Sequence, residues 1–283
     1  MIIVPAVGRG NRTRLTVRFH PFIPCGFRPP SRDGRGIRGR IAATYKSEAR
    51  TDVKTLALIT AAGKGLRMQS PIPKQYLLLG GRPILAQTLS VFEKCPDIDG
   101  VYVIVPQDQM EMVQRDIIEK YRFKKVLKVV RGGKTRQQSV YNGLKAIRSD
   151  CAIVVVHDGV RPLVRERLIT ESIQAARKHG AAVVGVPARD TIKRATAGKK
   201  LKTLDREEIW MAQTPQSFQF PLLLKAYQKA EEDGFQGTDD AALVERLGHP
   251  VTLIQGDYTN IKITTPEDLA LAETLFERGK KRK

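Results

Sequence analysis

Short apolar runs alternate with amphipathic segments along most of this 283-residue chain, and that alternation restricts the fold more than any other feature. Five runs predict buried strands, at residues 56–59, 101–105, 126–130, 153–156 and 182–186. Helical spacing is found between them, at residues 83–93, 107–121, 135–148 and 165–179. Strands that alternate with helices of about 10–15 residues are typical of a doubly wound, mostly parallel sheet with helices on both faces. We therefore expect an α/β domain with a Rossmann-like sheet over residues 53–279.

Residues 189–208 interrupt the alternation with two short polar segments around the turn Gly198-Lys199-Lys200. This pattern predicts a β-hairpin, and too little of it is apolar for sheet core. We expect the hairpin to project from the domain and to act as a dimerisation arm. After it we expect a helix at 220–233, a helix capped by Thr238 and ending at Leu247, strands at 251–255 and 260–264, and a last helix from Pro266 to about Arg278.

The first 52 residues differ from the rest, because they carry eleven Lys or Arg and three Asp or Glu with little periodicity. Such a segment cannot bury enough apolar surface to offset its ordering entropy. A disordered basic arm, a targeting peptide and sequence upstream of the true start are all compatible with this composition. We favour a disordered extension without a role in the chemistry.

Composition limits the class of protein further. No apolar run approaches the ~18 residues of a membrane-spanning helix. The three cysteines have no metal-ligand spacing and no disulfide framework, which favours a reducing compartment and a cytoplasmic location. A plastid location is expected only if residues 1–52 are a transit peptide. The net charge of +20 leaves polyanionic partners open, including a nucleic acid bound through residues 1–52.

The loop after the first predicted strand is rich in small residues and carries cations, of which Arg67 and Lys74 lie seven positions apart. Small residues let a ligand approach the backbone, whose N–H groups then bind anions. The loop has neither the spacing of a dinucleotide-binding loop nor the ending of a P-loop, so a Gly-rich turn with solvated cations is the alternative.

Three more polar clusters follow predicted strands, at residues 131–139, 157–162 and 260–264. Because ligands of open α/β sheets bind beyond the carboxyl ends of the strands, we expect these clusters to meet. Asp158 is suited to a ribose hydroxyl or to a metal bound to phosphate. One carboxylate and several cations match phosphate chemistry, and they do not suit hydride or acyl transfer.

Each of these residues also has a structural interpretation. His157 is more simply a neutral, hydrogen-bonded histidine than a catalyst, and Asp158 alternatively caps a turn. Lys262 and Arg136 alternatively lie on solvated surfaces. The pair Asp239-Asp240 most simply places negative charge at a helix N-terminus, and Trp210 packs at the base of the hairpin.

Taken together, five ordered motifs resemble the 2-C-methyl-D-erythritol 4-phosphate cytidylyltransferase family. They are Ala61-Ala62-Gly63-Lys64-Gly65-Leu66-Arg67-Met68 with Pro73-Lys74-Gln75-Tyr76, His157-Asp158-Gly159-Val160-Arg161-Pro162, Arg189-Asp190-Thr191-Ile192-Lys193, Thr214-Pro215-Gln216 and Asn260-Ile261-Lys262-Ile263-Thr264. The resemblance covers about residues 54–277, and residues 1–52 have no counterpart in it. It implies transfer of CMP from CTP to methylerythritol phosphate with release of pyrophosphate, in non-mevalonate isoprenoid biosynthesis, with Mg²⁺ as the cofactor.

The resemblance also implies roles for individual residues. The catalytic set is Arg67, Lys74, Arg206 and Lys262. The nucleotide- and substrate-binding set is Ala61, Ala62, Gly63, Gly133, Ser139, Asp158, Arg161, Thr191 and Thr214, with Asp158 also on the metal side. Thr191 and Arg206 of the hairpin are implied to bind the sugar phosphate in the site of a neighbouring subunit, which makes the protein a homodimer.

Two departures from the family pattern affect the pocket, Lys134-Thr135 in place of a common acidic residue and Gly159-Val160 in place of two alanines. A ribitol 5-phosphate cytidylyltransferase has the same loop and fold and is the nearest alternative. A nucleic-acid-binding protein and a catalytically inactive nucleotide sensor are the alternatives from other classes.

Overall fold

The computed structural model describes residues 54–63, 65–148, 150–196 and 200–281. The predicted extension at residues 1–52 lies outside them. The described part contains a seven-stranded sheet in the order β11-β7-β10-β6-β1-β4-β5. Its strands are β1 (Lys54–Thr60), β4 (Gly100–Val105), β5 (Val126–Arg131), β6 (Cys151–Asp158), β7 (Ala181–Pro187), β10 (Trp210–Gln219) and β11 (Thr252–Gln255). All neighbours pair in parallel except β10, which is antiparallel to both β6 and β7.

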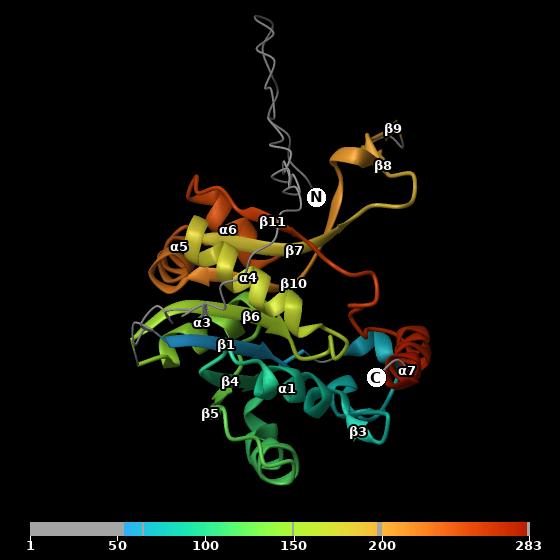
Figure 1. The fold of residues 1–283 in the computed structure, drawn as a ribbon. Coiled ribbons are helices and arrows are strands. Elements are labelled where there is room, and N and C mark those ends of the chain that lie inside the picture. The colour runs from blue at the N-terminus through green and yellow to red at the C-terminus, as the bar shows by residue number, and fades with distance from the viewer. Residues whose placement is uncertain (1–53, 64, 149, 197–199, 282–283) are drawn as a thin grey trace, which may run out of the picture. The chain divides into compact units, whose positions relative to one another are not determined.

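Helices cover both faces of this sheet, as the alternation predicts (Figure 1). Side chains of a strand alternate between faces, so Ala57 and Ile59 of β1 face one way and Leu56 and Leu58 the other. The first face packs against α1 (Ile84–Lys94) and α4 (Glu166–His179). The second packs against α3 (Arg136–Ala146), α5 (Phe220–Glu232) and α6 (Asp240–Arg246). The predicted α/β fold class is therefore confirmed.

A smaller apolar cluster holds the last helix, α7 (Pro266–Lys281), beside the main sheet. In it Ala272 of α7 meets Met68, Leu79, Val160 and Ile263. Met68 belongs to the loop after β1, Val160 to the loop after β6, and Ile263 to the segment before α7. This cluster therefore ties together three of the four segments that carry the predicted polar motifs, the loop after β1, the loop after β6 and residues 260–264.

The predicted hairpin is present as β8 (Lys193–Ala195) and β9 (Leu201–Thr203), antiparallel with Lys193 opposite Thr203. Its strands lie away from the main sheet (Figure 1), and most of their side chains are exposed. Residues 197–199, which include the first two residues of the predicted turn, lie outside the described residues. A short two-stranded hairpin on its own is only marginally stable in water.

Some sequence-based expectations about elements are wrong. Residues 260–264 form no strand, because their polar groups bond to the loop after β6 and to β10, with Ile263 N–H donating to Val160 O at 2.9 Å. The cap of α6 is Asp239 and not Thr238, since its carboxylate accepts the N–H of Ala242 at 3.0 Å. Strand β5 is largely exposed because it lies at an edge of the sheet.

The segment expected as one helix at 107–121 is divided into a 3₁₀ turn (Gln107–Gln109), α2 (Met110–Val113) and a π-helical stretch (Gln114–Glu119). Strand β10 was not predicted at all. Among the described residues no helix is long and apolar enough to cross a lipid bilayer.

Candidate active site

A cleft of about 700 Å³ opens beyond the carboxyl ends of β1, β5 and β6, where polar loops follow the parallel strands. Most of the predicted site residues line it. They are Ala61, Ala62, Gly63, Arg67, Lys74, Gly133, Ser139, Asp158 and Lys262. These residues come from four separate segments, and the topology of a parallel sheet is what brings them together.

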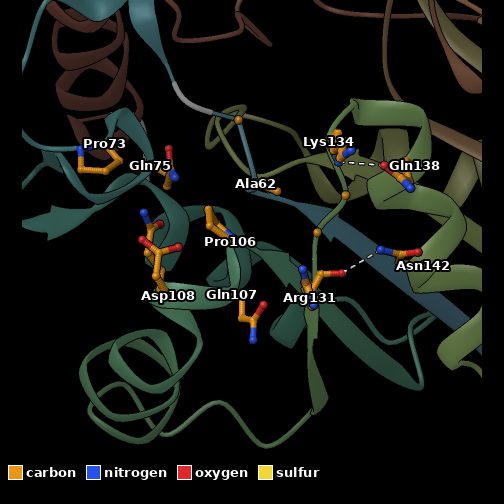
Figure 2. A pocket seen from close by; sticks show the side chains of 14 residues that line it. Ala62, Pro73, Gln75, Pro106, Gln107, Asp108, Arg131, Lys134, Gln138 and Asn142 are labelled. Atoms are coloured by element: carbon orange, nitrogen blue, oxygen red, sulfur yellow. Dashed lines mark hydrogen bonds between the residues drawn. The ribbon is translucent and has the colours of Figure 1, made fainter.

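A second hollow of about 660 Å³ adjoins the first, and both are lined by Ala62, Gly63, Gln75, Gly133 and Lys134. Figure 2 shows Pro73 and Gln75 on one side of this hollow and Lys134 and Gln138 on the other. The Lys134 N–H donates to Gln138 Oε1 at 2.8 Å, which shapes the turn into α3. The two hollows together form one polar crevice along the loop after β1.

The loop after β1 keeps its shape through close backbone packing. Ala61 N–H donates to Ile104 O at 2.8 Å, and the buried side chain of Gln75 donates to Ala61 O at 3.0 Å. A Cβ at Gly132 would lie 2.5 Å from the Cβ of Ala62, so only glycine lets the two loops approach this closely. The loop backbone is thereby held against the β5 loop, at a distance set by packing.

Asp158, the last residue of β6, is the electrostatic centre of the cleft. Its Oδ2 lies 3.0 Å from Lys262 Nζ and 3.2 Å from Arg161 Nε, and its Oδ1 lies 3.7 Å from Arg136 Nε. Burial alone would raise the pKa of this carboxyl, but Lys262, Arg136 and Arg161 outweigh it and hold the pKa well below its usual range. Asp158 is therefore ionised at every pH at which the protein is expected to work.

A chain of hydrogen bonds fixes the backbone at Asp158. The buried His157 contacts Arg161 O through Nε2 at 3.2 Å and Thr214 Oγ1 through Nδ1 at 3.0 Å. Since a carbonyl oxygen only accepts, Nε2 carries the proton and Nδ1 accepts the Thr214 hydroxyl. Thr214 Oγ1 then accepts the Asp158 N–H at 3.1 Å. Burial lowers the pKa of His157 to about 4, so the histidine is neutral, as the structural interpretation predicts.

Lys74 is the most unusual cation of the cleft, because only 8% of its surface is exposed. Burial, and then the neighbouring charges of Lys262 and Arg67, lower the pKa of its ammonium. Neither Lys74 nor Arg67 forms an ion pair with a carboxylate among the described residues. Positive charge that is not neutralised by the protein favours an anionic ligand.

Four predicted site residues do not line this cleft. Arg161 and Thr214 are buried, and both orient Asp158 through hydrogen bonds. Arg161 Nε donates to the Asp158 carboxylate, and Thr214 Oγ1 accepts the Asp158 N–H. Thr191 and Arg206 are exposed on the hairpin arm, where Arg206 Nη1 donates to Arg189 O at 3.2 Å. Their predicted role in a neighbouring subunit's site stays a prediction.

Sequence reasoning missed the importance of Arg136 and Asp240. Arg136 is not on a solvated helix surface, because it lines the cleft and forms a two-pronged ion pair with Asp240. Asp240 is fully buried, whereas Asp239 alone caps α6. Opposite charges 104 positions apart give no pattern in a sequence. Trp210, expected to pack at the hairpin base, is 37% exposed.

The cleft has one acidic side chain among its described lining residues, Asp158, and no group of three metal-ligating side chains occurs in the described part of the chain. Mg²⁺ is commonly held by one or two carboxylates together with substrate phosphates. Asp158 Oδ1 makes one long contact, 3.7 Å to Arg136, so this donor set fits an ion that is held mainly by the ligand.

Comparison with known proteins identifies the family. The family model described as 2-C-methyl-D-erythritol 4-phosphate cytidylyltransferase, IspD, matches residues 55–278. The chain belongs to this family. It is 48% identical over 224 residues to the 2-C-methyl-D-erythritol 4-phosphate cytidylyltransferase of Geobacter metallireducens, covering 78% of this chain and 97% of the relative. The relative with the same name in Geotalea uraniireducens is 49% identical over 227 residues, covering 80% and 97%.

A solved member of the family has the same fold. The 4-diphosphocytidyl-2C-methyl-D-erythritol synthase of Anaerococcus prevotii is 34% identical, with a TM-score of 0.71, covering 80% of this chain and 96% of the other. The resemblance stated from the motifs is thereby confirmed. The match to the IspD family model ends at residue 278, within α7. The family domain therefore includes the arm and every loop of the cleft.

Proposed function

We propose that this chain transfers CMP from CTP to 2-C-methyl-D-erythritol 4-phosphate, forming 4-diphosphocytidyl-2-C-methyl-D-erythritol and pyrophosphate in non-mevalonate isoprenoid biosynthesis. Membership of the IspD family supports the substrates. The observation that carries the chemistry is the buried Lys74, which shares one cleft with Arg67, Lys262 and Asp158 and forms no ion pair with a carboxylate among the described residues.

The reaction joins two anions, so repulsion between them is the main barrier that the protein must lower. A phosphate oxygen of the sugar attacks the α-phosphorus of CTP in line, and the bond from that phosphorus to the β-bridging oxygen breaks. The electron pair leaves with pyrophosphate. No general base is needed, because the attacking phosphate is already ionised near pH 7. Catalysis then comes from positioning and electrostatic stabilisation.

The residues of the cleft divide this work among them. Arg67 and Lys74 neutralise the charge that develops on the α-phosphate and the leaving pyrophosphate. Lys262 is anchored by Asp158 at 3.0 Å with 38% of its side chain exposed, so its remaining N–H groups orient the sugar phosphate. The backbone of Ala61, Ala62 and Gly63 wraps the nucleotide.

The base is placed at the turn into α3. Gly133 and Ser139 contact the cytosine, and Ser139 is itself fixed because its hydroxyl donates to Thr135 O at 2.8 Å. Asp158 binds the ribose and the metal side. Mg²⁺, when bound with CTP, neutralises phosphate charge, and Asp158 is the side chain that would hold it.

The arm implies a homodimer in which Thr191 and Arg206 reach the sugar phosphate of the partner's site. The exposure of β8 and β9 supports this arrangement. Mixing Lys74→Met chains with Arg206→Ala chains tests it, because each variant alone is expected to lose most of its turnover. Random exchange makes half of the dimers mixed, and one of their two sites is intact only if the arm acts in trans, which restores roughly a quarter of the wild-type activity. No recovery would mean that the arm acts within its own chain.

The function itself is tested by pyrophosphate release from CTP with Mg²⁺ and each candidate sugar phosphate. We expect turnover with methylerythritol phosphate that is at least about a hundredfold faster than with ribitol 5-phosphate. Faster turnover with ribitol 5-phosphate would overturn the assignment, and CTP binding without any release would indicate a nucleotide sensor. A cytoplasmic location is part of the proposal, and fractionation of cells that express the full chain tests it.

A further inference from the structure

A buried ion pair lies directly behind the wall of the cleft. Asp240, the first residue of α6, has no exposed surface. Its carboxylate accepts from Arg136 Nη1 at 3.1 Å and Nη2 at 2.6 Å, and it also accepts the hydroxyl of the buried Tyr227. The Asp240 N–H donates to Gln216 Oε1 at 3.2 Å. Asp240 is therefore held rigidly by three elements of the core.

Arg136, in contrast, reaches from this buried pair into the cleft. It is the first residue of α3, and 30% of its side chain is exposed. Both terminal nitrogens of its guanidinium bond to Asp240, while its Nε faces Asp158 Oδ1 at 3.7 Å. A planar guanidinium that is fixed at one edge cannot turn at the other. The contacts with Asp240 therefore fix the position of Arg136 beside Asp158.

The pair also sets the charge of the cleft. Arg136 has its own buried counter-ion, whereas Lys74 and Arg67 have no carboxylate partner in the described part of the chain. An arginine that is neutralised in this way attracts a triphosphate less than a free one. In the described part of the chain the uncompensated positive charge of the cleft therefore belongs to Arg67 and Lys74 of the loop after β1 and to the exposed Lys134 at the turn into α3, and not to Arg136.

We propose that Asp240 is a positioning residue that acts through Arg136: it holds the guanidinium against Asp158 and keeps its charge from the nucleotide. Arg136 is then not a phosphate ligand, although it lines the cleft. This inference rests on the proposed function for its turnover measurements, but its binding measurements need only CTP and pyrophosphate.

The decisive variant is Asp240→Asn, which releases the charge of Arg136 into the cleft. We expect kcat to fall about tenfold, because Asp158 loses its fixed neighbour. At the same time the Kd of CTP and the inhibition constant of pyrophosphate should fall severalfold, because an extra free cation binds both anions. Partial unfolding would lower kcat alone and leave both constants unchanged, so the split separates positioning from a structural role.

The double variant Arg136→Gln with Asp240→Asn replaces the ion pair by two amides. We expect kcat to stay low while the pyrophosphate constant returns to within about twofold of the wild type, since the released charge is gone. If the double variant binds pyrophosphate much more weakly than the wild type, Arg136 is itself a phosphate ligand and the proposal is wrong. Unchanged kcat and constants in Asp240→Asn overturn it as well.

Two further variants keep the test decisive if Asp240→Asn does not fold. Tyr227→Phe removes one hydrogen bond to Asp240 without a change of charge, and we expect effects of about two- to threefold in the same directions. Asp233→Asn is the matched control, because Asp233 pairs with Arg246 at 2.6 Å outside the cleft, and its kinetics should equal the wild type. Full activity and unaltered binding in Tyr227→Phe would count against the proposal.

Calorimetric binding of CTP and pyrophosphate by all variants remains informative even if the wild type fails to turn over methylerythritol phosphate. The two proposals can therefore fail separately.

Discussion

Lys74 should be essential for turnover and at the same time unfavourable for the stability of the fold. The ammonium is buried, and burial together with the charges of Lys262 and Arg67 lowers its pKa. A lowered lysine pKa means that the protein destabilises the charged form. Lys74→Met keeps the length of the side chain and removes this charge. We therefore expect activity and stability to change in opposite directions.

The sizes follow from the surroundings of the residue. Removal of one preorganised cation from a phosphoryl-transfer site costs about 3 kcal/mol of barrier, or about a hundredfold in rate. Relief of a buried, repelled charge is expected to be worth on the order of 1 kcal/mol, which raises Tm by about 2–4 °C in a domain of this size. The assays are pyrophosphate release at saturating CTP and calorimetric unfolding without ligand.

Lys128→Met is the matched control, because Lys128 is an exposed cation on β5 that lines neither hollow. Its turnover and Tm should match the wild type. Turnover of Lys74→Met within about threefold of the wild type would refute the electrostatic mechanism. A lower Tm in Lys74→Met than in the wild type would refute the claim that the charge of Lys74 destabilises the fold.

Three other predictions concern the residues around Asp158. His157 has a pKa of about 4 in the folded protein and about 6.5 when unfolded, so the unfolded state takes up the proton first. The unfolding free energy should therefore fall by about 3 kcal/mol between pH 6.5 and 4, and urea titrations of His157→Gln should show a flatter profile. Thr214→Val leaves the Asp158 N–H without its acceptor and should cost about 1–3 kcal/mol in urea unfolding, whereas Thr214→Ser should cost less than half as much. Lys262→Met should lower kcat/KM for the sugar phosphate about a hundredfold with little change in the Kd of CTP, and an equal loss of CTP binding would contradict the role given to it.

The sequence was sufficient for those parts of the fold that depend on apolar periodicity. All five apolar runs that were expected as strands are strands, and four of them are buried between helices, whereas β5 is largely exposed at the edge of the sheet. Strand β10 lacked that signal, since Gln213, Gln216 and Ser217 are polar and are buried only because partners from distant segments satisfy them. For residues 260–264 the error was the opposite one, because a strand was predicted and none is present. Their alternation is that of a strand, but the loop after β6 supplies partners for their polar groups.

The same distinction applies to the site. The clusters at 61–74, 131–139 and 157–162 were predicted to meet because the carboxyl ends of parallel strands lie on one edge. Contacts within that edge were not predictable, since they depend on which side chain pairs with which. Asp240 is the clearest case, because its carboxylate pairs with Arg136 on another helix and no spacing links the two.

The distribution of charge explains why some cations of the cleft form ion pairs with carboxylates and others do not. A cleft that binds a triphosphate needs cations, and gathered cations repel one another unless carboxylates separate them. Asp158 and Asp240 form ion pairs with Lys262, Arg161 and Arg136, so that two negative charges offset part of three positive ones at the wall of the cleft. Arg67 and Lys74 are left to the ligand, and the pKa of Lys74 is lowered first by burial and then by repulsion from Lys262 and Arg67. The acidic residues therefore influence where the phosphates bind as well as the basic ones do, because they form ion pairs with Arg136, Arg161 and Lys262 but, among the described residues, none with Arg67 or Lys74.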